Sequence, residues 1–130
     1  LPHLTAICEI LHAKDKRLGL HMCGLLKDLL PDIRKVGARA FEAFTSPTLG
    51  NTTLLDGRSA CPETCLIGGT NATLWTQPAE TIIATLERDL AELPHHRGLV
   101  VTSAGVMPPL APPDRIRAVC AWVQAYPARV

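Results

Sequence analysis

Residues 64–105 contain the pattern that decides the fold: TCLIGGTN (64–71), PAETIIATLERDLAEL (78–93) and GLVVTSAG (98–105). The first and third stretches are short, continuous apolar runs that end in small or polar residues, as buried parallel strands do. The middle stretch begins with Pro78 and has apolar residues at helical spacing, which predicts an amphipathic helix. A strand, a helix and a second strand in this order predict a parallel unit with a right-handed crossover.

The same alternation extends on both sides of this unit. Strands are predicted at 17–24 and 38–44, and helices at 4–14, 25–37, within 45–63 and at 112–126. The 25–37 helix is predicted to contain an internal Pro31 and to end at Gly37. The chain is thus interpreted as a single α/β domain spanning residues 1–130, with four parallel strand–helix units. Two architectures fit this order: an open doubly wound sheet, or the C-terminal half of a TIM (β/α)8 barrel.

Composition excludes several classes of protein. Hydrophobic residues make up 47% of the chain, charged residues 19% and aromatic residues 4%, and the formal net charge is +1. This balance indicates a globular protein with no basic or base-stacking surface for nucleic acid and no attraction to an anionic membrane. The sequence has no membrane-spanning stretch and no signal-peptide pattern, so a cytoplasmic location is expected. Five cysteines, an odd number, favour reduced thiols.

Ligands of parallel α/β domains bind at the carboxyl ends of the strands, and two of these ends carry reactive groups. His21 and Cys23 are separated by one residue at the end of the first predicted strand, so both side chains point to one face and form a candidate zinc-binding pair. The alternative is a half-buried histidine beside a small core cysteine. Glu42, near the end of an apolar strand, is a candidate base, metal ligand or ion-pair partner, unless it simply reaches solvent.

The other two strand ends offer further candidates. Gly69 and Asn71 belong to a turn in which glycine would let a ligand or cofactor approach the backbone, although a plain strand-to-helix turn explains it as well. Ser103 lies at the end of the last strand. His95 and His96 fall in a connection at the opposite end of the fold, where we expect exposure to solvent.

Three segments together resemble the C-terminal half of the uroporphyrinogen decarboxylase superfamily. They are HMCGLLKDLLPDIRKVGARAFEAFTSPTLGNTTL (21–54), CLIGGTNATLW (65–75) and SAGVMPPLAPPDRIRAVCAWV (103–123). The resemblance rests on the His-x-Cys-Gly strand end, the strand followed by Thr-x-Pro and Gly, the Gly-Gly strand end, and the final strand with its proline-rich loop and helix. It implies a (β/α)8 barrel, of which this chain is a partial domain. A missing N-terminal half or a homodimer is expected to complete it.

The superfamily contains two chemistries. Its decarboxylases act on uroporphyrinogen without a cofactor, whereas its methylcobamide:coenzyme M methyltransferases hold zinc through His-x-Cys and a later cysteine and activate a thiol for methyl transfer. His21 and Cys23 match the first two zinc ligands, and Ala104 stands where the third is expected. The resemblance therefore favours a zinc-dependent methyltransferase with a partner-borne corrinoid, in which Glu42 or Ser103 completes the site. The alternatives are a tetrapyrrole decarboxylase-like lyase and a non-catalytic half-barrel that self-associates.

Overall fold

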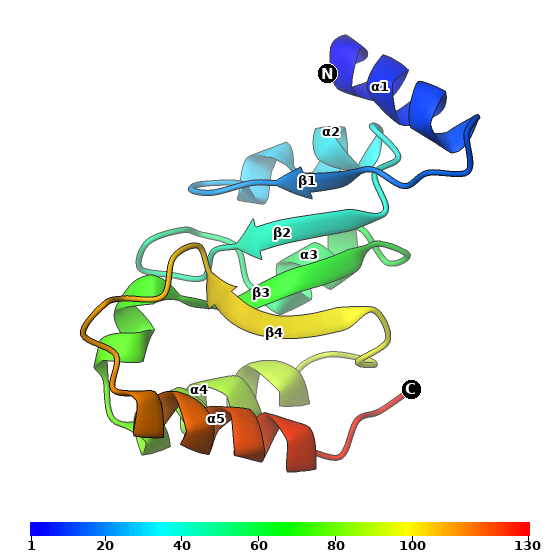
Figure 1. Cartoon of the computed structure of the whole chain (residues 1–130). Helices are drawn as coiled ribbons and strands as arrows, with labels where there is room; N and C mark the ends of the chain where they lie inside the picture. Colours follow the sequence, from blue (N-terminus) through cyan, green and yellow to red (C-terminus); the bar gives the residue numbers. More distant parts are fainter.

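The computed structural model describes every residue from Leu1 to Val130. Its centre is a sheet of four parallel strands in the spatial order β1 (Gly19–His21), β2 (Ala40–Phe44), β3 (Cys65–Asn71) and β4 (Leu99–Ala104), as Figure 1 shows. Strands that are neighbours in the sheet also follow one another in the sequence, so each connection moves the chain one strand further in the same direction. The predicted α/β fold with four parallel strands is confirmed.

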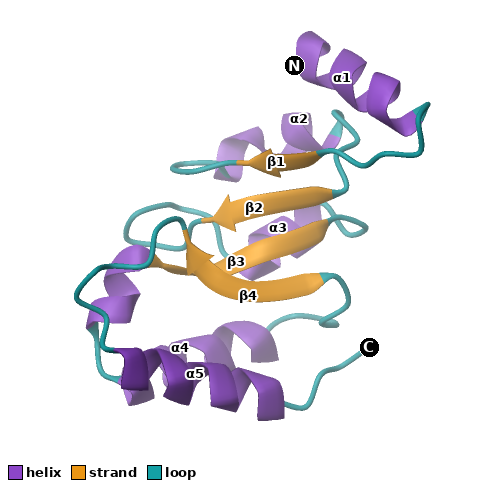
Figure 2. Ribbon diagram, in the orientation of Figure 1, coloured by secondary structure: helices purple, strands orange, loops and turns teal.

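Helices alternate with these strands (Figure 2). The helical elements are α1 (Pro2–His12) before β1, η1 (Lys27–Leu29) and α2 (Leu30–Arg34) before β2, α3 (Leu54–Ala60) before β3, η2 (Ala72–Thr76) and α4 (Ala79–Ala91) before β4, and α5 (Pro113–Ala125) after it. None of these helices has both the length and the apolar character that crossing a membrane requires.

One face of the sheet carries the core. Leu20, Phe41, Leu66 and Leu99 are partners in register across the four strands, so their side chains lie on the same face. They belong to or pack against a cluster that also contains buried side chains of α1, α2, α3 and α4. A second cluster joins α4 to α5 and extends this layer beside β4. The helices therefore cover this face of the sheet.

The opposite face is open. His21, Glu42, Ile67 and Val100 are partners in register on this face, and none of them is buried. In Figure 1 the sheet is seen from this side, with α2 and α3 behind it. A doubly wound sheet has helices on both faces, so that alternative does not describe this chain.

Two helical segments differ from a simple amphipathic pattern. The single helix predicted for 25–37 is wrong: a 3-10 turn is followed by a helix of five residues. Pro31 has no N–H and fixes its own φ, so it stands in the first turn of α2 rather than in a helix interior. The helix α1 forms where predicted, but Leu4, Ile7 and Ile10 are exposed on it.

Candidate functional site

Strand register places His21 beside Glu42. The strand β1 ends at His21, and β2 pairs Glu42 with it. The N–H of Met22 donates to the carbonyl of Glu42 over 3.0 Å, which continues the pairing one residue further. Partners in neighbouring parallel strands point to the same face at a strand spacing of about 4.8 Å. Both side chains therefore meet on the open face.

These two residues and Cys23 form a chain of contacts that we call the Glu42–His21–Cys23 triad. Glu42 Oε2 contacts His21 Nδ1, and His21 Nε2 lies 3.2 Å from the Sγ atom of Cys23. When Nδ1–H donates to the carboxylate, Nε2 presents its lone pair toward the thiol. The side chains of His21 and Glu42 are 63% and 38% exposed, so a ligand can reach the triad from solvent.

A bulge in β2 follows Glu42 directly. The register with β3 shifts between Glu42 and Phe44, and Ala43 between them is fully buried with a φ of 61°. This conformation costs a non-glycine residue on the order of 1–3 kcal/mol and persists only where its surroundings hold it. The Thr45 hydroxyl donates to the Ala43 carbonyl over 2.8 Å. The bulge thus interrupts the pairing of β2 with β3 directly after the residue whose carboxylate contacts His21, and pairing resumes at Phe44.

The two glycines of β3 make room for neighbouring elements. A Cβ atom on Gly68 would lie 2.9 Å from the backbone nitrogen and oxygen of Phe44, so a side chain here would collide with the bulged strand. A Cβ atom on Gly69 would lie 3.0 Å from a methyl group of Leu54 in α3. The structure thus places Gly69 against a helix of its own chain.

Asn71 uses its side chain within the chain. Its Oδ1 accepts from the N–H of Leu74 at 2.8 Å and from the hydroxyl of Thr73 at 2.7 Å. Its Nδ2 donates to the carbonyl of Pro47 at 2.5 Å and to the hydroxyl of Ser46 at 3.3 Å. Asn71 therefore caps η2 and ties it to the loop after β2. A cofactor-binding role for Gly69 and Asn71 stays a prediction.

Ser103 and Ala104 lie far from the triad. The strands β2 and β3 separate β1 from β4, and at about 4.8 Å per strand this distance is about 14 Å. The Ser103 hydroxyl donates to the carbonyl of Gly105 over 3.2 Å, and Ala104 is buried with no side-chain donor atom. The structure places Ser103 beside Thr70, between the candidates Gly69 and Asn71, and away from the triad. The catalytic role of Ser103 stays a prediction.

The loop that follows Cys23 is tied to the start of α3. Lys27 Nζ lies 3.0 Å from Asp56 Oδ1, and the backbone N–H of Lys27 donates to Asn51 Oδ1 over 3.2 Å. Thr53 and Asp56 form a capping box in which each side chain accepts from the other residue's backbone N–H over 3.0 Å. Burial raises the pKa of Asp56, but these hydrogen bonds and Lys27 outweigh it and bring the pKa below its ordinary value of 3.8.

Asp56 is therefore expected to make stability depend on pH in the acid range. Because its pKa is lowered in the folded chain, the stabilisation is complete above pH 3.8 and is lost as pH falls through the folded pKa. Asp56→Asn should lower the free energy of unfolding at neutral pH by about 1 kcal/mol and should flatten its fall at acid pH. Urea unfolding at neutral and acid pH measures both effects. Asp114→Asn, at a carboxylate that is 95% exposed, is the control, and an equal flattening in it would contradict the assignment.

The donor atoms of the triad fit part of a zinc site. Histidine nitrogen and cysteine sulfur are preferred zinc ligands, and here they converge to 3.2 Å. Glu42 contacts the other ring nitrogen, so it fits the carboxylate that orients a metal-binding histidine rather than a third ligand. No set of three or more His, Cys, Asp or Glu side chains in the chain is arranged to hold a metal ion. The triad thus offers two ligands and one supporting carboxylate.

The pairing of Glu42 with His21 is the part of the site that sequence reasoning missed. From the sequence, Glu42 is a base, a metal ligand or the ion-pair partner of a nearby arginine or lysine, whereas the structure pairs it with His21. The partner depends on the register of β1 with β2. Aligning the two strands by their first residues, Gly19 with Ala40, pairs His21 with Glu42. That alignment is the signal that could have found it.

A match to a known family agrees with the resemblance seen in the segments 21–54, 65–75 and 103–123. Residues 1–126 match the family model described as uroporphyrinogen decarboxylase (URO-D). Because the match covers nearly the whole chain, the chain belongs to the uroporphyrinogen decarboxylase family. No curated protein matches it.

Proposed function

We propose that the chain is a zinc-binding member of the methyltransferase branch of this family and activates a thiol for methyl transfer. The Glu42–His21–Cys23 triad is the observation that carries the proposal, because it combines two zinc ligands with the carboxylate that commonly supports a metal-bound histidine. A zinc ion bound there supplies a Lewis acid that lowers the pKa of a substrate thiol.

Each residue of the triad has a distinct role in this proposal. Cys23 binds as a thiolate, and its exposed position lets the displaced proton leave to water. His21 binds through Nε2. Glu42 accepts from Nδ1–H, which fixes the tautomer and the orientation of the imidazole ring. The open face leaves room for a small thiol substrate beside Cys23, and the methyl group would come from a corrinoid carried by a partner protein.

We also propose that the four strands are half of an eight-stranded barrel. The sequential strand order, the helices on one face and the open opposite face support this, because barrel helices lie outside and barrel side chains fill the inner face. The strands β1 and β4 each leave one edge unpaired. A second copy of the chain, or an N-terminal half, would close the barrel and place side chains opposite the triad, where a third zinc ligand is needed.

A tetrapyrrole decarboxylase-like protein is the second candidate, which the description of the matching family favours. Porphyrin titrated into the chain distinguishes the two candidates by its absorption band. A band shift that persists after His21→Ala would favour the decarboxylase-like candidate. The zinc proposal expects the triad to bind metal and no porphyrin.

A cytoplasmic location is part of the proposal. All five cysteines are free, including Cys61 and Cys65, which are close in sequence. Free thiols, one of them a proposed zinc ligand, are typical of reducing compartments.

Metal content and mass, measured on one sample, test the proposed function. The chain is purified without chelators, equilibrated with zinc and freed of excess metal, and then analysed by light scattering and elemental analysis. We expect a dimer with about one zinc ion for each triad. A folded chain that retains no zinc would overturn the proposal.

A further inference from the structure

A buried arginine without an acidic partner lies at the amino ends of β3 and β4. Arg58 of α3 is 4% exposed. Its Nη1 donates to the carbonyls of Pro62 and Thr64 over 2.7 and 3.1 Å, and its Nη2 donates to the carbonyl of Arg97 over 2.7 Å. Arg58 makes no ion pair, and its Nε is buried without a hydrogen-bond partner. The Nε donor is thus buried without an acceptor, and the buried guanidinium charge is without a direct ion pair.

Arg58 lines a polar cavity of about 370 Å³. The other walls are the turn before β3 (Pro62–Thr64) and the segment before β4, which contributes His95 and Arg97. The Nδ1 atom of His95 is also buried without a partner. The expectation that His95 is exposed is therefore wrong, because Arg58 binds the carbonyl of Arg97 and holds this segment against α3.

His96 is half-buried as well, contrary to expectation. Its Nε2 lies 3.0 Å from the carbonyl of Leu90, and its Nδ1 accepts from the backbone N–H of Arg129 over 2.9 Å. Both ring nitrogens of His96 thus have partners inside the chain. His95 is the histidine of this pair that is left with a free ring nitrogen at the cavity.

Positive charge predominates around the cavity. Glu63 is the one carboxylate among the lining residues, against Arg58 and Arg97. Burial lowers the pKa of His95, the charges of Arg58 and Arg97 lower it further, and Glu63 opposes them in part. Burial also lowers the pKa of Arg58. The surroundings therefore disfavour more positive charge and favour an anion.

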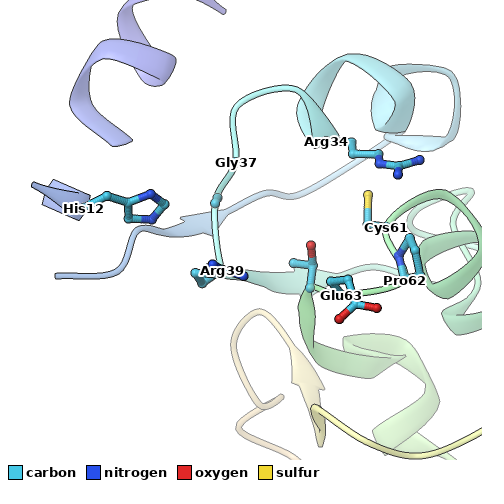
Figure 3. Close-up of a pocket in the computed structure, with 9 residues that line it drawn as sticks. His12, Arg34, Gly37, Arg39, Cys61, Pro62 and Glu63 are labelled. Carbon is cyan, nitrogen blue, oxygen red and sulfur yellow. The ribbon is translucent and has the colours of Figure 1, made fainter. Parts of the chain in front are cut away.

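A neighbouring cavity extends this positive surface. It has a volume of about 360 Å³, shares the turn Pro62–Thr64 with the first cavity, and is also lined by His12, Arg34 and Arg39. Figure 3 shows Arg34 and Arg39 on opposite sides of it. Neither arginine makes an ion pair. Unpaired arginines thus gather at the amino end of the sheet although the net charge of the chain is only +1.

We propose that the cavity at the amino ends of β3 and β4 binds the phosphate group of a small polar ligand through Arg58, His95 and Arg97. A phosphate carries about −1.5 to −2 charge at neutral pH and three strong acceptor oxygens, so it satisfies the free nitrogens and balances both arginines. The cavity has no hydrophobic lining residue, which disfavours an apolar ligand. Because the strands are parallel, this site lies at the end of the sheet opposite the triad and does not rest on the zinc proposal.

Calorimetric titration of the full chain with inorganic phosphate tests this site. Arg97→Gln is expected to weaken binding roughly tenfold or more, since it removes a charge-assisted hydrogen bond. The backbone carbonyl of Arg97 that holds Arg58 is unchanged in this variant. Glu63→Gln should tighten binding by removing the repelling carboxylate. Arg117→Gln, at an exposed arginine of α5 paired with Asp114, is the control and should bind like the unaltered chain.

Two further titrations separate the possible results. Glycerol 3-phosphate binding more tightly than inorganic phosphate would support a ligand that also fills the rest of the cavity, and equal binding would support recognition of the phosphate alone. Sulfate keeps its charge over the neutral and mildly acid pH range, so a change in its binding with pH comes from the protein. It should bind more tightly as pH falls, because His95 then takes up a proton. The charged or titratable groups near His95 are Arg58, Arg97, Glu63 and His96. The absence of saturable binding, or equal losses from Arg97→Gln and Arg117→Gln, would overturn the proposal.

Discussion

Cys23→Ser is expected to remove zinc from the chain, and Glu42→Gln to lower zinc affinity by about 10- to 100-fold. A serine hydroxyl is not a zinc ligand at neutral pH, so His21 alone remains from the triad. Glutamine keeps an oxygen near Nδ1 of His21 but loses the charge that supports the ring. Elemental analysis measures the first effect, and competition with a chromophoric chelator measures the second.

Matched variants keep this result interpretable. Cys120→Ser removes another exposed cysteine, on α5, and Glu87→Gln neutralises an exposed glutamate on α4. Both should bind zinc as the unaltered chain does. If Glu42→Gln left zinc affinity unchanged, Glu42 would have no supporting role. If Cys120→Ser lost as much zinc as Cys23→Ser, the metal would lie outside the triad.

Gly57→Ala is expected to lower the free energy of unfolding by about 1–3 kcal/mol. Helix propensity alone predicts the opposite sign, because alanine in a helix interior is more favourable than glycine by about 1 kcal/mol. A Cβ atom on Gly57, however, would lie 2.5 Å from the ring of Phe44 and 3.3 Å from a methyl group of Leu66. Both neighbours are buried, so neither can move into solvent.

Urea unfolding of Gly57→Ala, Ser59→Ala, Phe44→Leu and the Phe44→Leu/Gly57→Ala double variant tests this explanation. Ser59→Ala, at an exposed position of the same helix, should change the free energy of unfolding by no more than about 0.5 kcal/mol. Phe44→Leu removes the ring, and in that background Gly57→Ala should cost less than it does alone. An equal cost in both backgrounds would show that contact with Phe44 is not the cause.

Sequence periodicity predicts the elements whose pattern is local. The β3–α4–β4 unit follows from apolar spacing and from Pro78, and the structure has all three elements within the predicted ranges. The helix predicted for 25–37 failed because periodicity continues through Pro31 while the backbone cannot. The spacing of apolar residues therefore predicts whether a segment is a helix or a strand. Single residues such as Pro31 decide where that helix or strand begins or ends.

The triad and the arginine-lined cavity both depend on contacts between residues that are far apart in the sequence. His21 and Cys23 were found because they are close in sequence, whereas their link to Glu42 depends on strand register. Arg58 looks like an ordinary solvated residue of a short helix. Its burial depends on three carbonyls contributed by two connections distant from each other in the sequence. The same contacts explain why His95, which looks like a surface residue, borders a cavity.

The open face of the sheet has a consequence for the strength of the triad's electrostatics. In bulk water two unit charges 4 Å apart interact by about 1 kcal/mol, and at an effective dielectric constant of 20 by about 4 kcal/mol. With side chains 63% and 38% exposed, His21 and Glu42 make their contact in largely aqueous surroundings. Any molecule that covers this face excludes water and strengthens the attraction between them. Closing the sheet and holding the triad in place are thereby coupled, so any partner that covers the open face also stabilises the contact between His21 and Glu42.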